Sequence, residues 1–180
     1  MIAWIDKAGT VAVIVAVWLF VYLVLVVWIF LYRYFVLRGW AKRENGSVQS
    51  LLGGAERPNF DSSLYPCVRQ SFGPELMKAC YESATKDSTK LLTSISAIAS
   101  TAPFVGLFGT IVGILQAFAG FSEGVTLSTV APAISEALVV TAMGIVVAIP
   151  AYWTHLLLKR KAYEVTNAIK VQIDILLSRT

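Results

Sequence analysis

The sequence is short of charged residues, cysteine and histidine, and these shortages exclude several classes of protein. Asp, Glu, Lys and Arg make up 14% of its 180 residues, whereas an ordinary soluble domain has about 25%. Two cysteines are too few for a disulfide scaffold, and 12% aromatic residues argue against intrinsic disorder. Hydrophobic residues reach 57%, and the mean hydropathy is +0.69. This composition indicates an integral membrane protein.

Three long runs of the sequence are almost free of charge. Residues 8–32 and 91–122 carry none, and residues 124–158 carry one acid, Glu136, and one histidine, His155. A bilayer core of about 30 Å needs about 20 helical residues, so each run is long enough to span it. We predict an all-α membrane protein with three transmembrane helices, near residues 9–32, 100–121 and 129–156.

The first run is too long for a secretory signal sequence. Such a signal has an apolar stretch of about 7–15 residues and then a small-residue cleavage site. Here an aromatic and basic belt from Tyr32 to Arg43 follows instead, which is typical of a membrane surface. We therefore interpret the first run as a transmembrane helix.

The basic residues predict the orientation of the chain. Of the fifteen, Lys7 alone precedes the first run, nine lie within residues 33–90 and five follow Leu158. By the positive-inside bias, the 33–99 loop and the C-terminal tail are cytoplasmic and the N-terminus is periplasmic. The net charge of +4 then reflects topology and does not indicate nucleic-acid binding.

The predicted cytoplasmic loop contains turn signals and one helix start. We expect a turn at residues 44–47, a break over residues 53–59, and a helix that begins at Pro74, where proline is tolerated. No Gly or Pro interrupts the chain between that point and the second span, so we expect the second span to begin in the cytoplasm as a continuation of this helix. Cys67 and Cys80 lie on the reducing side and are expected to be free thiols.

These features divide the chain into four predicted segments. The second and third helices extend into the cytoplasm in this scheme. The segments are a first transmembrane helix with an external N-terminus (1–40), a cytoplasmic helical loop (41–99), a channel-forming hairpin of the second and third transmembrane helices (100–158) and a cytoplasmic C-terminal helix (159–180).

Familiar catalytic signatures are missing from the sequence. It contains no phosphate-binding loop, no cysteine pairs at metal-ligand spacing and a single histidine. His155 lies near Tyr152, Trp153 and Lys159, and we interpret it as part of a membrane-edge belt. We predict no enzymatic activity, no cofactor and no metal.

Glu136 is the one acid within a predicted span. A carboxylate there costs about 2.5–3.5 kcal/mol, and such residues usually face a bundle interior or a water-filled path. Its helical neighbours within about 60° are Ala133, Val140, Met143 and Val147, so the face is otherwise apolar. The alternative is a glutamic acid that only packs helices together; we favour the functional interpretation.

The second span carries a stripe of glycines and one deep hydroxyl group. Gly106, Gly109, Gly113 and Gly120 share one face and include a Gly-x-x-x-Gly step, which allows helices to approach closely. We interpret them as packing positions, which also fits an obligate oligomer. Thr110 lies deep in this span. In the third span Thr141 is about 140° from Glu136, so it is expected to face a neighbouring helix.

Two long segments resemble the signatures of a known family. Residues 98–114, IASTAPFVGLFGTIVGI, resemble the second-span signature of the ExbB/TolQ/MotA family. Residues 130–150, VAPAISEALVVTAMGIVVAIP, resemble its third-span signature. The N-terminal half is similar mainly in layout. The resemblance implies a subunit of a motor in the bacterial inner membrane that is driven by the proton-motive force.

The resemblance also implies partners and site residues. Such subunits form a homo-oligomer, a pentamer, around a dimer of an ExbD/TolR-like single-span protein, and work with a TonB- or TolA-like protein in contact with membrane lipid. By motif position, Glu136, Thr110 and Thr141 belong to the proton pathway, and the apolar face of Glu136 lines the pore. We expect H⁺ rather than Na⁺, because Na⁺ would require more oxygen ligands than these residues supply.

The branch of the family stays open. Residues 98–110 are most similar to ExbB, which serves TonB-dependent import, whereas residues 126–132 look more like TolQ, which serves Tol-Pal envelope maintenance. Alternatives are a MotA-like flagellar subunit, although that branch has four spans, and a non-conducting membrane scaffold. The sequence departs from many relatives at residues 133–135, Ala-Ile-Ser in place of Gly-Ile-Ala, and in its shorter cytoplasmic region.

Overall fold

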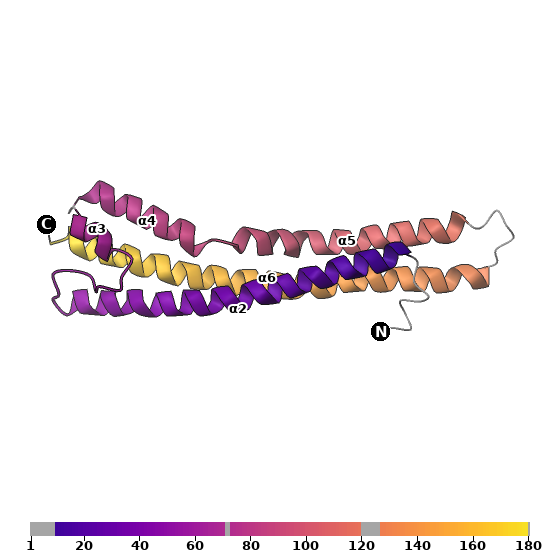
Figure 1. Cartoon of the computed structure of the whole chain (residues 1–180), viewed down its shortest axis with the longest axis horizontal. Helices are drawn as coiled ribbons and strands as arrows, with labels where there is room; N and C mark the ends of the chain where they lie inside the picture. Colours follow the sequence, from indigo (N-terminus) through magenta and orange to yellow (C-terminus); the bar gives the residue numbers. More distant parts are fainter. Residues whose placement is uncertain (1–9, 71–72, 120–126, 180) are drawn as a thin grey trace. The chain divides into compact units, whose positions relative to one another are not determined.

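The computed structural model describes residues 10–70, 73–119 and 127–179, and every regular element in these ranges is a helix. This confirms the all-α fold. Figure 1 shows the helices in chain order: α2 (Thr10–Leu52), α3 (Tyr65–Gln70), α4 (Pro74–Ser88), α5 (Leu92–Ala119) and α6 (Leu127–Leu177).

Three stretches of the described chain are long and apolar enough to cross a membrane, which confirms three transmembrane helices: Val11–Leu52, Pro74–Phe118 and Val130–Leu177. Each stretch is about twice as long as a bilayer core requires, so part of each lies outside the hydrocarbon. Large side chains such as Trp18, Phe104 and Val146 are exposed on the protein surface. Lipid is as apolar as these side chains, so it can cover them without cost.

The chain forms two compact units, and the long helices contribute to both. The span unit comprises Met1–Trp28 and Ser94–Thr154, and the loop unit comprises Ile29–Thr93 and His155–Thr180. Within the span unit, α5 packs against the first part of α6, as the contacts of the α5 glycines show. The loop unit has an apolar cluster whose buried members are Leu51, Val68, Met77 and Leu176.

The turn predicted at residues 44–47 is wrong, because α2 continues as a helix to Leu52. Glu44 and Ser47 are completely buried, and their polar groups find partners across the loop unit. Gln172 donates from Nε2 to the Glu44 carboxylate at 2.8 Å, and its Oε1 accepts from the Ser47 hydroxyl at 2.8 Å. The Ser62 hydroxyl and the Ser63 amide also donate to the Glu44 carboxylate, each at 2.8 Å. These contacts outweigh the local turn preference.

The break predicted over residues 53–59 is confirmed at its first position. Helix α2 ends at Leu52, and the following backbone turns at Gly54, whose φ of 100° lies in the left-handed region that favours glycine. The amides of Gly53 and Gly54 donate to the carbonyls of Gln49 and Leu51, which closes the last turn of the helix.

The continuous helix predicted from Pro74 into the second span is wrong. It divides into α4 and α5 at Leu91, which has a φ of 66°. Arg33 of α2 donates from Nη2 to the carbonyl oxygens of Asp87 at 2.9 Å and Ser88 at 2.6 Å. These are carbonyls of the last turn of α4, where the helical hydrogen-bond pattern ends. The Asp87 carbonyl also accepts from the amide of Lys90 at 3.4 Å, and the guanidinium adds a donor to both. On the other side of the break, His155 Nδ1 lies 3.2 Å from the carbonyl oxygen of Leu92.

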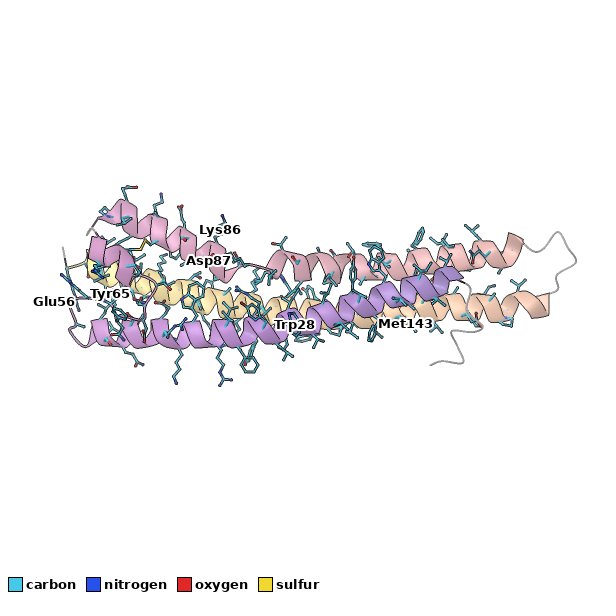
Figure 2. All side chains as sticks on the ribbon, viewed as in Figure 1. Trp28, Glu56, Tyr65, Lys86, Asp87 and Met143 are labelled. Atoms are coloured by element: carbon cyan, nitrogen blue, oxygen red, sulfur yellow. A yellow bond between two sulfur atoms is a disulfide. The ribbon has the colours of Figure 1, made fainter. Side chains whose placement is uncertain are left out.

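The two cysteines are joined by a disulfide, so the expectation of free thiols is wrong. Cys67 of α3 and Cys80 of α4 have Cα atoms 6.7 Å apart, a separation that a disulfide can bridge. Figure 2 draws the bond in yellow between the two helices. The prediction of reduced thiols was based only on the expected cytoplasmic location of the loop. In the structure, the packing of α3 against α4 brings the two sulfur atoms together.

We predict that Glu44→Ala destabilises the loop unit. The substitution removes the carboxylate that accepts hydrogen bonds from Gln172, Ser62 and Ser63, and we expect a loss of about 2–4 kcal/mol in the free energy of unfolding. Denaturant unfolding of the detergent-solubilised protein measures this loss. Glu56→Ala is the matched control, because Glu56 is exposed. Equal effects of the two substitutions would contradict the role of the buried network.

We further predict that Glu44 makes the fold sensitive to acid. Glu44 lies about 18 Å along the helix beyond Tyr32, outside the charge-free run. Burial opposes ionisation, but the hydrogen bonds from Ser63, Gln172 and Ser62 outweigh it and hold the pKa of Glu44 below its usual 4.5. A lowered pKa stabilises the fold above the usual value, and this stabilisation is lost as pH falls through the lowered one. The difference in unfolding free energy between the wild type and Glu44→Gln should therefore shrink between about pH 6 and pH 3. A difference independent of pH would contradict the assignment.

Candidate functional site: a threonine pair between two glycine-lined helices

Helices α5 and α6 approach closely because glycines stand at their contact. A Cβ atom on Gly106 would lie 3.0 Å from the carbonyl oxygen of Val140 and 3.1 Å from the Cα of Thr141. A Cβ atom on Gly109 would lie 2.7 Å from Cγ1 of Val140. Gly113 faces Ala137 in the same way, with a Cβ separation of 3.1 Å. Three of the four predicted packing glycines thus face α6, and the fourth, at position 120, lies outside the described residues.

The contact includes a glycine of α6 that our sequence analysis did not identify. A Cβ atom on Gly144 would lie 2.7 Å from the carbonyl oxygen of Ala102 and 3.2 Å from the Cα of Gly106. Backbone therefore meets backbone at this point, as in small-residue contacts between membrane helices. Gly144 is the one glycine within the predicted third span. A single glycine in an otherwise bulky span could have been predicted as a position of close helix contact.

The close approach brings two hydroxyl groups together. The Oγ1 atoms of Thr110 on α5 and Thr141 on α6 form a hydrogen bond with each other. Each also lies 3.2 Å from the carbonyl oxygen of Gly106, and Thr110 Oγ1 lies 3.3 Å from that of Ala137. Since a hydroxyl can donate one hydrogen bond and accept two, either oxygen of the pair can be the donor to the other.

Glu136 lies on α6, five residues before Thr141, and takes no part in the hydrogen bonds of the pair. The residue is half-buried, and among the described residues none makes a hydrogen bond or ion pair with its carboxyl group. A carboxyl group in a span costs free energy unless a partner or water solvates it.

The four residues predicted to line the pore lie in different surroundings. Val140 is completely buried against Gly109, whereas Ala133 is half-buried. Met143, labelled in Figure 2, and Val147 line an apolar cavity of about 480 Å³ between α6 and α2 in the span unit. The role of this face in a pore stays a prediction. Among the described residues no cluster of His, Cys, Asp or Glu could hold a metal ion.

Comparison with known proteins identifies the class to which this arrangement belongs. Residues 62–171 match the MotA/TolQ/ExbB proton channel family. The ExbB-like 1 biopolymer transport protein of Helicobacter pylori (strain J99) is 40% identical over 185 residues, which cover 99% of this chain and 97% of the relative. Salmonella typhimurium ExbB is 41% identical over 90 residues, or 47% of this chain and 37% of that protein. TolQ of Pseudomonas aeruginosa is 50% identical over 62 residues, or 33% and 27%.

The protein is a multi-pass protein of the bacterial inner membrane, with the three spans and the sequence similarity of a proton channel subunit. The chain belongs to the MotA/TolQ/ExbB family, as the resemblance of its second and third spans predicted.

We predict that Gly144→Ala destabilises the span unit. The added methyl group would meet the carbonyl of Ala102 at 2.7 Å, and because backbone cannot move as a side chain can, α5 and α6 must separate. Overpacking of this kind costs about 1–3 kcal/mol, measurable as a lower midpoint of thermal unfolding in detergent. Gly39→Ala is the matched control, because a Cβ atom there has no neighbour within 4 Å. A midpoint lowered equally by both substitutions would contradict the prediction.

Proposed function

We propose that the chain is the ring-forming subunit of an ExbB/TolQ-type motor, which couples proton flow across the inner membrane to force transfer toward the outer membrane. The observation that carries the proposal is the hydrogen-bonded hydroxyl pair of buried Thr110 and half-buried Thr141. On the same helix as Thr141, Glu136 has a carboxyl group without a partner among the described residues. Family membership supports the coarser conclusion, a subunit of a proton channel.

The sparse polar groups favour a pathway shared with other chains. The threonine pair is enclosed between α5 and α6, and Glu136 does not join its hydrogen bonds. A continuous proton path therefore needs groups or water from outside the chain. We propose that an ExbD/TolR-like single-span protein supplies these groups. Five copies of this chain would form a homo-oligomeric ring around that protein. A threonine pair and one glutamate offer few oxygen ligands, which favours H⁺ over Na⁺.

The relatives support a role in transport. The Helicobacter pylori protein carries the name ExbB-like and matches nearly the whole chain, whereas the TolQ of Pseudomonas aeruginosa matches one third of it. We therefore favour the ExbB branch, with a TonB-like protein as the further partner, over the TolQ branch with a TolA-like one. In the orientation that the basic residues favour, the N-terminus is periplasmic and the 41–99 and 159–180 segments are cytoplasmic.

We predict that proton flux requires both the hydroxyl pair and the carboxyl group. The chain would be reconstituted with its single-span partner in vesicles, and proton entry under an imposed membrane potential would be followed with a pH-sensitive dye. Thr110→Val, Thr141→Val and Glu136→Gln should each reduce the flux by about tenfold or more, because each removes a group that exchanges protons.

Two controls separate a lost pathway from a lost assembly. Thr110→Ser and Thr141→Ser keep the hydroxyl group and should retain most of the flux. Recovery of the partner in the purified complex shows whether each variant still assembles. If assembled Glu136→Gln and Thr141→Val complexes conduct like the wild type, the pathway assignment is wrong and the non-conducting scaffold is favoured.

A further inference from the structure

A basic groove runs between α2 and α6 in the loop unit, apart from the threonine pair. Its volume is about 730 Å³. Gly39 contributes to the opening, because a Cβ atom there would have no neighbour within 4 Å. The lining residues that matter for binding are Phe35, Arg38, Lys42, Asn45, Lys161 and Glu164.

The groove has two cations without a matching acid. Among the described residues, none forms an ion pair or hydrogen bond with the side chains of Arg38 and Lys42. The acid that lines the groove, Glu164, is already bound: Lys161 Nζ lies 2.6 Å from one carboxylate oxygen and Arg160 Nε lies 3.6 Å from the other. Both side chains are exposed, so their positive charge is available to an anion from outside the chain.

The groove begins where the apolar part of each helix ends. Arg38 and Lys42 follow Tyr32 by about 9 and 15 Å along α2, and Lys161 follows Leu158 by about 4.5 Å along α6. Lipid phosphates lie just beyond the hydrocarbon core, and the long side chains of Arg and Lys can reach back toward them. Phe35, which is 67% exposed, lines the same groove one turn nearer the apolar run.

We propose that this groove binds the phosphate head group of an anionic phospholipid. Arg38 supplies a planar guanidinium that can bind two phosphate oxygens, Lys42 supplies a second positive charge, and Phe35 contacts the upper part of the acyl chains. A soluble anion would use the two cations but gain nothing from Phe35. Basic pockets between membrane helices are known to recognise such head groups.

The test compares lipid binding by the full-length protein with that of two double variants. Purified protein in neutral detergent is titrated with phosphatidylglycerol, and the retained lipid is counted by native mass spectrometry. Arg38→Gln with Lys42→Gln should weaken phosphatidylglycerol binding by about tenfold or more, because it removes both unmatched cations. Arg57→Gln with Lys170→Gln is the control, with the same residue types and the same change of charge on exposed positions outside the groove; its binding should equal that of the wild type.

Three outcomes would overturn the proposal. The first is equal phosphatidylglycerol binding by the two double variants. The second is equally tight competition by inorganic phosphate, which would make the ligand a soluble anion. The third is a smaller oligomer for the groove variant with unchanged lipid retention, which would make the groove a contact between copies of this chain. Lipid counting does not use proton flux, so its result is independent of the proposed channel function.

Discussion

The close approach of α5 and α6 is the constraint on which the span unit depends. At Gly106 and Gly144 the two backbones meet, and no side chain other than hydrogen fits between them. The same approach brings the Thr141 hydroxyl to 3.2 Å from the Gly106 carbonyl, which the Thr110 hydroxyl also contacts within α5, and lets the two hydroxyl groups bond to each other. A larger separation would break the bond between the two hydroxyl groups and the bond of Thr141 to the Gly106 carbonyl, whereas Thr110 would keep its bond to Gly106 within α5. The glycine contacts that let α5 and α6 pack closely therefore also bring the two hydroxyl groups together.

The loop unit differs from the span unit because it buries two charged side chains, Glu44 and Arg33. Glu44 is completely buried without a cation, and it is stabilised by several neutral donors. Arg33 is buried without a carboxylate and is stabilised by helix-terminal carbonyls. Glu44 is thus satisfied by dipoles rather than by an opposite charge, whereas the Nε atom of Arg33 is buried without a hydrogen-bond partner among the described residues. Such networks hold helices in one register, because a shifted helix would leave a charge unsatisfied.

The two units support complementary roles in the proposed motor. The span unit offers a hydroxyl pair, a half-buried carboxyl group and apolar surface, which suits contact with a second membrane chain. The loop unit presents basic residues just beyond the apolar parts of α2 and α6, where we propose that anionic lipid binds. In both units the polar groups proposed to act are few, and they lie on neighbouring helices: α5 and α6 in the span unit, α2 and α6 in the loop unit.

The number of spans and the family were determined by the sequence alone. Lipid imposes long apolar runs that composition reveals directly, and the two span motifs identify the family. The helix through Glu44, the break at Leu91 and the Cys67–Cys80 disulfide were decided by tertiary structure. Their causes are distant in sequence: Gln172 lies 128 residues from Glu44, and Arg33 lies 55 residues from Ser88. The helix and turn propensities used for sequence-based prediction depend only on residues close together in the chain. It therefore cannot detect a turn suppressed, or a helix ended, by a hydrogen bond from another helix.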